Sequence, residues 1–397
     1  MAIGDCVAMN IPFVAFSLPG EKEFCHFFAS LPDSEGRSPV KMSGNDTDCF
    51  ILSRFAADEP YTSGVMAQYD ARGIEDYICN NRMVVPLPFS PARPSLISTS
   101  RVAHMKHMSE LIRAIKTHGD KDSKVVLSVH RSLFASVSIS ALAARYIQLN
   151  PSNFGYICYT PENGLWFGST PEVLAESEVG SDIVNTMALA GTRWDPSVPW
   201  DKKNIREHKI VVDYITDTLR SLGYTVTKGR RHNLRTGGVE HMCTLITGRG
   251  DHSFVDTVNH LNPTPAVCGT PLPLAMTSID LLETHQRHCY SGALLLRYGG
   301  KLRAYVNLRC GFAAQAWMQA ENERISGWVI NLYSGGGILA DSDPATEWEE
   351  TQRKQQPIID SILSCQPGEP MLVMENPVNA HFGYANTVIA GLLFDKK

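Results

Sequence analysis

The sequence lacks the cysteine patterns of zinc-binding and disulfide-rich proteins. Its ten cysteines are scattered, without a C-x-x-C pair and without cysteine and histidine at zinc spacing. They are predicted to be reduced thiols, several of them buried, in a reducing compartment. The sequence also lacks an apolar run of membrane-spanning length, and its N-terminal segment lacks the basic residues that begin a signal peptide. These absences predict a cytoplasmic protein without a membrane-spanning helix.

A large excess of charge of either sign is absent as well. The chain of 397 residues has 36 lysines and arginines against 41 aspartates and glutamates, a formal net charge of -5. Such a balance gives no reason to expect nucleic acid or an anionic membrane as a partner. Internal repeats and low-complexity tracts are also missing, and 43% of the residues are hydrophobic. The chain is therefore long and apolar enough to bury a sizeable core.

Composition divides the chain into three portions. Residues 1–90 contain short apolar runs separated by glycine, proline, aspartate and serine, which predicts a strand-rich N-terminal portion. A proline- and serine-containing segment at 89–100 leads into a portion at 100–365, where strand meanders are interrupted by separate helices. This pattern favours an α+β fold over regular βαβ winding. Residues 366–397 form a C-terminal tail with no assigned role and one possible strand at 387–394.

Periodicity predicts individual elements within the portion at 100–365. Apolar residues recur at helical spacing and predict helices at 100–118, 138–148, 201–222 and 272–286. A continuous apolar run predicts a strand at 124–132.

Residues able to carry chemistry gather near the end of this portion. The glycines Gly335–Gly337 follow a run with strand character, and the free amides of a glycine turn suit an anion. Asp343 and Pro344 then indicate a helix start, as N-cap and first helical residue. On that helix two carboxylates and an ammonium share a face, from Glu347, Glu350 and Lys354. The stretch predicts a site for an anionic ligand and a metal ion, with an exposed, salt-bridged helix as the alternative.

Six motifs follow one another along the chain in a fixed order. They are KVVLS from Lys124, GSTPEVL from Gly168, LAGTR from Leu189, EHKIVVDYI from Glu207, PTPAVCG from Pro263 and SGGGILADSDPATEWEETQRK from Ser334. In this order they resemble the chorismate-utilising enzymes, which include isochorismate, salicylate, anthranilate and aminodeoxychorismate synthases. The resemblance covers roughly residues 100–365. It implies an α+β fold of two large antiparallel sheets stacked face to face with helices outside, to which the N-terminal portion contributes.

The resemblance also implies a substrate and a reaction. Members of the family add a nucleophile at C2 of chorismate and expel the hydroxyl at C4, with the help of a magnesium ion, a base and an acid. The implied magnesium ligands are Glu207 and Glu350, with Glu347 nearby. Glu172 matches the general acid, and a carboxyl in that role needs a raised pKa, so we expect it to be partly desolvated.

Further residues match the substrate-binding positions of the family. Arg309 matches the arginine that binds the pyruvyl carboxylate, a task that suits a guanidinium. His208 is expected to orient substrate groups, with a purely structural role as the alternative. The remaining expected contacts to the substrate come from Gly191, Thr192, Gly335, Gly336, Gly337 and Lys354.

Lys124 distinguishes water from ammonia as the nucleophile. Ammonia-using relatives carry glutamine at this position, whereas relatives that use water carry lysine. We interpret Lys124 as a buried base with a lowered pKa, and a solvated strand end is the alternative. Ala190 stands where aminodeoxychorismate synthases have a nucleophilic lysine. Together these residues predict hydration of chorismate to isochorismate. The resemblance implies an enzyme that needs no glutaminase partner, and a monomer is our default expectation.

Two other functions stay open at the level of sequence. A salicylate synthase would make isochorismate and then eliminate pyruvate, and a non-catalytic relative would bind chorismate without turnover. Isochorismate can feed menaquinone, siderophore or salicylate formation, and the sequence does not choose among them. The chain departs from the family pattern at Val129, Asn262 and Leu295, and we expect Leu295 to lie close to the substrate pocket.

Overall fold

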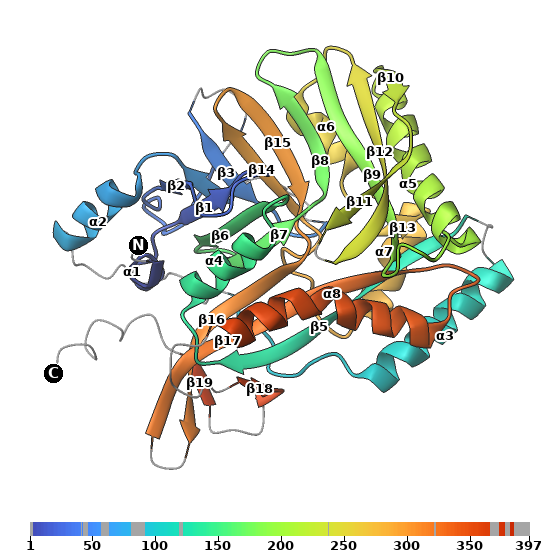
Figure 1. The fold of residues 1–397 in the computed structure, drawn as a ribbon. Coiled ribbons are helices and arrows are strands. Elements are labelled where there is room, and N and C mark those ends of the chain that lie inside the picture. The colour runs from blue at the N-terminus through green and yellow to red at the C-terminus, as the bar shows by residue number, and fades with distance from the viewer. Residues whose placement is uncertain are drawn as a thin grey trace.

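The computed structural model describes residues 3–40, 42, 47–56, 63–80, 92–118, 122–236, 238–320, 323–365, 373–377 and 382–384. Within these residues the strands form two sheets, of ten and nine strands, with helices around them (Figure 1). Neighbouring strands run antiparallel, as in the pairs of β5 with β17 and of β9 with β12. The predicted α+β fold of two antiparallel sheets is confirmed.

The ten-stranded sheet combines both ends of the chain with its middle. Its order is β13-β5-β17-β16-β7-β6-β1-β2, with β18 paired to β5 and β19 to β16. The strands are β1 (Phe13–Ser17), β2 (His26–Ala29), β5 (Lys124–Ala135), β6 (Phe154–Thr160), β7 (Gly164–Thr170), β13 (Gly269–Thr270), β16 (Cys310–Ala320), β17 (Glu323–Ile338), β18 (Val373–Glu375) and β19 (Phe382–Tyr384). Because β1 pairs with β6, the N-terminal portion forms one sheet with the rest.

The nine-stranded sheet has the order β10-β12-β9-β8-β15-β14-β3-β4, with β11 paired to β12. Its strands are β3 (Cys49–Leu52), β4 (Gly64–Met66), β8 (Val173–Glu178), β9 (Ile183–Arg193), β10 (Thr225–Lys228), β11 (His232–Thr236), β12 (Val239–Arg249), β14 (Ala293–Tyr298) and β15 (Lys301–Val306). Here too an N-terminal strand, β3, pairs with a strand from the far end of the chain, β14.

The helices begin where polar caps predict. The N-cap side chains of Ser138, Asp201 and Asp343 each accept a hydrogen bond from the backbone three residues on. The helices are α1 (Ile3–Ala8), α2 (Ala71–Asn80), α3 (Arg101–His118), α4 (Ile139–Leu149), α5 (Lys202–Ser221), α6 (Phe254–Leu261), α7 (Leu272–Leu282) and α8 (Pro344–Ser364). No helix of these described residues is long and apolar enough to cross a membrane.

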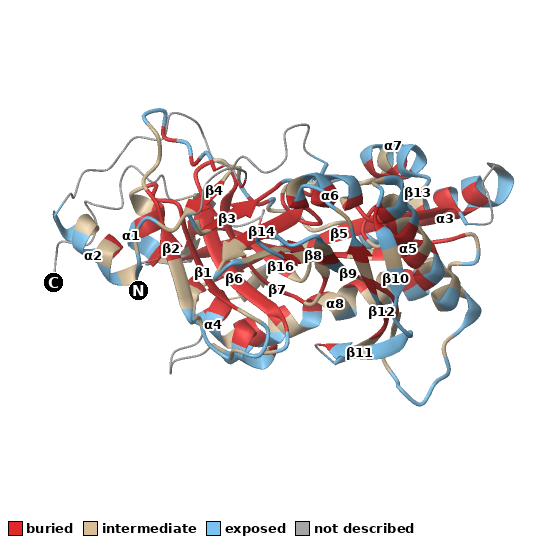
Figure 2. Ribbon diagram, turned by 90° about the horizontal axis from the view of Figure 1, so that it is seen from above, coloured by how far each residue is buried: buried red, intermediate tan, exposed pale blue. Residues whose placement is uncertain are grey.

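Apolar side chains fill three layers, and the buried residues run through the middle of the molecule (Figure 2). Phe16, Trp166 and Leu294 belong to the layer between the two sheets. A second layer lies under α1, α4 and α8, and a third lies under α5 and α6. Strand β14 contributes side chains to two of these layers, because alternate residues of a strand point to opposite faces.

Leu295 lies on the helix side of β14, away from the expected pocket. It is 0% exposed and packs with Ala304 and Ile51 in the layer under α5 and α6. The expectation that this departure from the family pattern borders the substrate pocket is wrong. Its larger side chain instead fills the outer core.

Most predicted elements are present, and the differences have physical reasons. The helix predicted to run to residue 286 ends at Leu282, because Glu283 turns away to form a buried ion pair. Elements that were not expected include strands β8, β11 and β16 and helices α1, α2 and α6. The glycines Gly335–Gly337 lie within strand β17 and not in a turn. The possible strand at 387–394 falls outside the described residues.

The ion pair of Glu283 with Arg287 anchors the loop after α7. Both side chains are 3% exposed, with Nη2 of Arg287 2.6 Å from Oε1 of Glu283. Arg287 also donates to the carbonyls of Val267 and Val126, at 2.8 and 2.7 Å. The backbone N–H of Ser128 donates to Glu283 at 2.6 Å. The pair therefore ties this loop to β5.

We predict that Arg287→Ala lowers the free energy of unfolding by about 3–5 kcal/mol, because Glu283 is left buried without a counter-charge. The control is Arg249→Ala, which breaks the exposed pair with Asp182 and is expected to lower it by less than about 1 kcal/mol. Urea unfolding of both variants checks this. Similar losses in both would contradict the role given to the buried pair.

Candidate active site

Seven of the predicted site residues line one pocket near the ends of β5 and β17. Strands β9 and β12, helices α5 and α8, and the loops before β8 and β16 complete its walls. The predicted residues that line it are Glu172, Gly191, Thr192, Glu207, Arg309, Gly335 and Lys354. Tyr290 and Tyr333 stack on each other beside them, with ring centroids 5.3 Å apart.

Lys124 begins β5, and its side chain is 0% exposed. Its Nζ lies 2.8 Å from Oε1 of Glu207, as an ion pair that lacks the alignment of a hydrogen bond. The opposite strand provides the room for this pair. A Cβ on Gly337 would lie 2.7 Å from Cε of Lys124 and would also collide with Oε1 of Glu207. Glycine at position 337 therefore leaves the space that the pair occupies.

Glu207 stays ionised although it is buried. Burial alone would raise the pKa of its carboxyl, but Lys124 and Lys203 outweigh burial and lower the pKa to about 2. A carboxylate held in this state can accept a metal ion as well as a lysine.

Glu172 has the opposite character. It lies between β7 and β8, is 5% exposed, and its backbone N–H donates to Oγ1 of Thr170 at 3.3 Å. Burial raises the pKa of Glu172 to about 7, against the lowering effects of Lys124, Lys354 and Arg309. The carboxyl is therefore able to hold and release a proton near neutral pH.

A β-bulge shapes the wall formed by β9 and β12. The pairing register shifts at Gly191, where φ is 76°, a conformation that favours glycine. The carbonyl of Gly191 accepts a hydrogen bond from Nδ1 of His241 at 3.0 Å. The backbone N–H of Thr192, the next residue, donates a hydrogen bond to Oδ1 of Asn204 at 2.9 Å. The bulge thus turns both predicted residues toward the pocket.

His241 holds Arg309 and was not expected from the sequence. Because Nδ1 donates to Gly191, Nε2 is free to accept from Nη2 of Arg309, at 2.9 Å. Burial, Arg309 and Lys354 lower the pKa of His241 to about 3, so the imidazole stays neutral. Arg309 also donates to the carbonyl of Thr236 at 3.1 Å. A histidine in an apolar strand gives no signal for this role.

The glycine run does not form an anion-binding turn. Gly335–Gly337 pair in register with Val126–Ser128 of β5, and their φ angles are not positive, so the expected turn conformation is wrong. The carbonyl of Gly335 accepts a hydrogen bond from Nζ of Lys354 at 2.8 Å. The same ammonium lies 2.7 Å from Oε1 of Glu350. Lys354 thus joins α8 to the strand end at the pocket.

Glu347 is the most buried of the three predicted metal ligands. Its side chain is 3% exposed, and Oε1 is paired with Nζ of Lys203, which sequence reasoning missed. Its other oxygen, Oε2, has no hydrogen-bond partner among the described residues and would lie 3.4 Å from a Cβ on Gly336. Burial raises the pKa of Glu347, and Glu350 adds to this, whereas Lys203 opposes it. The signal for Lys203 in the sequence was its place one helical turn before Glu207.

Each of the three predicted metal ligands is therefore paired with a lysine. The pairs are Glu207 with Lys124, Glu347 with Lys203 and Glu350 with Lys354. Within the part of the chain that the structure describes, no three acidic, histidine or cysteine side chains are arranged as a metal site. The carboxylates are neutralised by ammonium groups in this arrangement.

His208 lies away from the pocket, and the expectation that it orients substrate groups is wrong. It follows Glu207 on α5 and points about 100° further around the helix, against the nine-stranded sheet. There its Nε2 lies 2.8 Å from Oγ1 of Thr244, and the side chain is buried. Burial lowers the pKa of His208 to about 4, so it serves as a neutral packing residue.

Two other departures from the family pattern also lie outside the pocket lining. Val129 and Arg131 share the face of β5 that looks toward α8, as alternation predicts, and Arg131 donates to Gln352 at 2.6 Å. Asn262 is the C-cap residue of α6.

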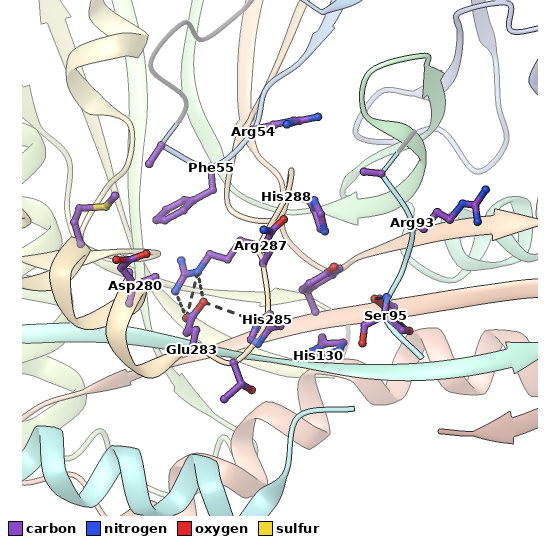
Figure 3. A pocket seen from close by; sticks show the side chains of 18 residues that line it. Arg54, Phe55, Arg93, Ser95, His130, Asp280, Glu283, His285, Arg287 and His288 are labelled. Atoms are coloured by element: carbon purple, nitrogen blue, oxygen red, sulfur yellow. Dashed lines mark hydrogen bonds and ion pairs between the residues drawn. The ribbon is translucent and has the colours of Figure 1, made fainter. Parts of the chain in front are cut away.

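A second and larger cavity of about 1000 Å³ shares Tyr333 with this pocket. His130 and His285 line it, with ring centroids 4.7 Å apart, as does the pair of Glu283 with Arg287 (Figure 3). None of the predicted site residues lines it among the described residues. The predicted residues that line a cavity thus belong to the smaller pocket.

Comparison with known sequences and structures points to one family. A family model described as chorismate binding enzyme matches residues 86–363. Isochorismate synthase MenF of Escherichia coli (strain K12) is 30% identical over 309 residues, which cover 72% of this chain and 67% of that protein. Anthranilate synthase component 1 of Acetivibrio thermocellus is 28% identical over 297 residues, which cover 70% of this chain and 56% of that protein.

The fold is shared with a solved relative. The menaquinone-specific isochorismate synthase MenF from Escherichia coli superposes with a TM-score of 0.68 and 21% sequence identity, covering 92% of each chain. The match includes the N-terminal portion, in agreement with its strands in both sheets.

We predict that the difference in free energy of unfolding between Glu172→Gln and the unaltered protein, the stability gap, depends on pH. The folded-state pKa of Glu172 is about 7, above its ordinary 4.5, so its contribution to stability is full below pH 4.5 and is lost as pH rises through 7. Glutamine has no such loss. Between pH 4 and pH 8 the gap should therefore shift by roughly 3 kcal/mol in favour of the glutamine variant. Urea unfolding at both pH values measures it, and a gap that does not change with pH would disprove the raised pKa.

Proposed function

The chain belongs to the chorismate-binding enzymes, and we propose that it is an isochorismate synthase, an isomerase that adds water at C2 of chorismate and releases the C4 hydroxyl. The observation that carries the proposal is the placement of Lys124, a completely buried lysine whose ammonium contacts Glu207 in the wall of the pocket that also holds a protonatable Glu172. A base and an acid at one site match the two proton transfers of this reaction.

Lys124 takes a proton from water as its oxygen bonds to C2, and Glu172 gives a proton to the hydroxyl that leaves C4. The ring double bonds shift between these carbons, so atoms and charge balance. Glu172 suits the acid role because burial keeps its pKa near 7. Lys124 can act as a base only as a neutral amine. The carboxylate of Glu207 favours the charged form of Lys124, so during turnover Glu207 must be paired with a different cation.

Cationic groups in the pocket suit the two carboxylates of chorismate. Arg309 is fixed by His241 and the carbonyl of Thr236, which leaves its guanidinium oriented on the pocket wall. A guanidinium held in this way favours a carboxylate over a neutral group. Lys354 lines the pocket next to Gly335 and supplies a second positive charge.

The residues present fit a magnesium ion. Oε2 of Glu347 is buried without a hydrogen-bond partner among the described residues, and the backbone of Gly336 beside it carries no side chain. An all-oxygen donor set is what magnesium prefers. The ion would be held by Glu207, Glu347 and Glu350, and would supply a Lewis acid that polarises a substrate carboxylate.

Water as the nucleophile removes the need for an ammonia supply. We therefore infer that the chain works without a glutaminase partner. A monomer stays the default expectation for its oligomeric state. Salicylate synthase is the second candidate, since it shares the hydration step, and product analysis separates the two.

We predict that purified protein, incubated with chorismate and magnesium, gives isochorismate in equilibrium with chorismate, both with and without ammonium. Chromatography of the products checks this. Salicylate and pyruvate would replace the proposal with the second candidate. An aminated product would refute water as the nucleophile, and bound but unchanged chorismate would indicate a non-catalytic relative.

We predict that Lys124→Ala lowers kcat/KM by at least about 100-fold while the fold is retained, because the attacking water loses its base. The matched control is Lys209→Ala on α5, which removes a lysine that is 73% exposed and should change kcat/KM by less than about twofold. Steady-state assays and circular dichroism measure both. A fully active Lys124→Ala protein would exclude this lysine as the base.

A further inference from the structure

Lys203 has no place in the reaction described above, yet it is held inside the group of acidic residues at the pocket. It lies in the first turn of α5, one turn before Glu207, so both side chains extend from the same face of the helix. Its side chain is only 18% exposed, and Nζ contacts Oε1 of Glu347 on α8. A contact between the two helices is thus made by a buried cation and a buried anion.

All three predicted metal ligands act on this ammonium. Burial would lower the pKa of Lys203, but Glu207, Glu347 and Glu350 together raise it well above its ordinary value. Glu347 and Glu350 are one turn apart on α8 and face α5. The positive charge of Lys203 therefore lies in the midst of the carboxylates that a magnesium ion would bridge.

The other two lysines of this group have contacts beyond it. Lys124 lies against Gly337 of β17, and Lys354 donates to the carbonyl of Gly335 and lines the pocket. Lys203 is not among the described residues that line the pocket. Among the described residues its ion pair is with Glu347, and Glu207 and Glu350 act on its charge from nearby, so neutralisation of carboxylate charge is the role that its position supports.

We propose that Lys203 is a built-in counter-ion that takes the place of the metal ion in the metal-free protein and must leave the carboxylates when magnesium binds. This inference rests on the magnesium site of the proposed function. Without Lys203, Glu347 would have no cation of its own and would be repelled by Glu207 and Glu350, which keep their pairs with Lys124 and Lys354. The lysine removes that repulsion, and for the same reason it competes with the metal ion.

Two effects follow for a variant that lacks this charge. The metal-free protein is less stable, because Glu347 stays buried without a partner. Magnesium binds more tightly, because it no longer displaces a cation and meets one more unneutralised carboxylate. A lysine that instead helped to hold the metal or its water would give the opposite change in affinity.

The test is isothermal titration calorimetry with magnesium chloride, without substrate, on the unaltered protein and on Lys203→Met, together with melting temperatures at zero and saturating magnesium. We expect Lys203→Met to bind magnesium on the order of tenfold more tightly. We also expect Lys203→Met to have a lower melting temperature than the unaltered protein without magnesium. Its melting temperature should rise by more than that of the unaltered protein when magnesium is added. Lys202→Met, which alters the exposed neighbour, should match the unaltered protein in both measurements.

Lys203→Arg tests whether the positive charge or the shape of the side chain matters. It also provides a second variant in case Lys203→Met fails to fold. It keeps the positive charge, so its magnesium affinity should stay near that of the unaltered protein or fall below it. Unchanged or weaker binding by Lys203→Met, with normal binding by the unaltered protein, would overturn the inference and leave the proposed function standing. If the unaltered protein itself binds no magnesium, the metal assignment fails, and this inference fails with it.

Discussion

Charge compensation between buried carboxylates and lysines is the constraint on which the site depends. Several ionised side chains lie where α5 and α8 approach β5 and β17, and each must find a partner because a lone buried charge is strongly destabilising. The pairs are Lys124 with Glu207, Lys203 with Glu347 and Lys354 with Glu350. The pair of Lys124 with Glu207 joins β5 to α5, and the pair of Lys203 with Glu347 joins α5 to α8. The third pair lies within α8, where Lys354 also donates to the carbonyl of Gly335 on β17. The apolar layers stabilise the fold, but the charges determine its arrangement at this point.

The glycines of β17 make room for these pairs. Side chains at positions 336 and 337 would meet Glu347 and Glu207, so the strand approaches the helices with bare backbone. Their role is steric and comes from an extended strand, not from the exposed amides of a turn. Three glycines in a row therefore mark the place where charged side chains reach the sheet.

The sequence predicts best what depends on local pattern. Caps such as Asp201 and Asp343, and the order of the motifs, predict the helices, the two-sheet fold and most residues of the pocket. What it cannot predict depends on contacts between distant segments. His241 reaches Arg309 only because β12 and the loop before β16 meet at the pocket. The sequence also could not show which face of β14 Leu295 occupies, and in the structure it packs in the layer under α5 and α6.

The environment of each carboxyl, more than its identity, separates an acid from a metal ligand. Glu172 and Glu207 line the same pocket and are both buried, yet the pKa of one is about 7 and that of the other about 2. Lys124 acts on both, but it touches Glu207 at 2.8 Å, and within the described residues Glu172 forms no ion pair. Proximity to the ammonium groups of Lys124 and Lys203 therefore keeps Glu207 ionised, whereas Glu172 can keep its proton near neutral pH. Two buried carboxyls of one pocket are thus given different roles by the lysines beside one of them.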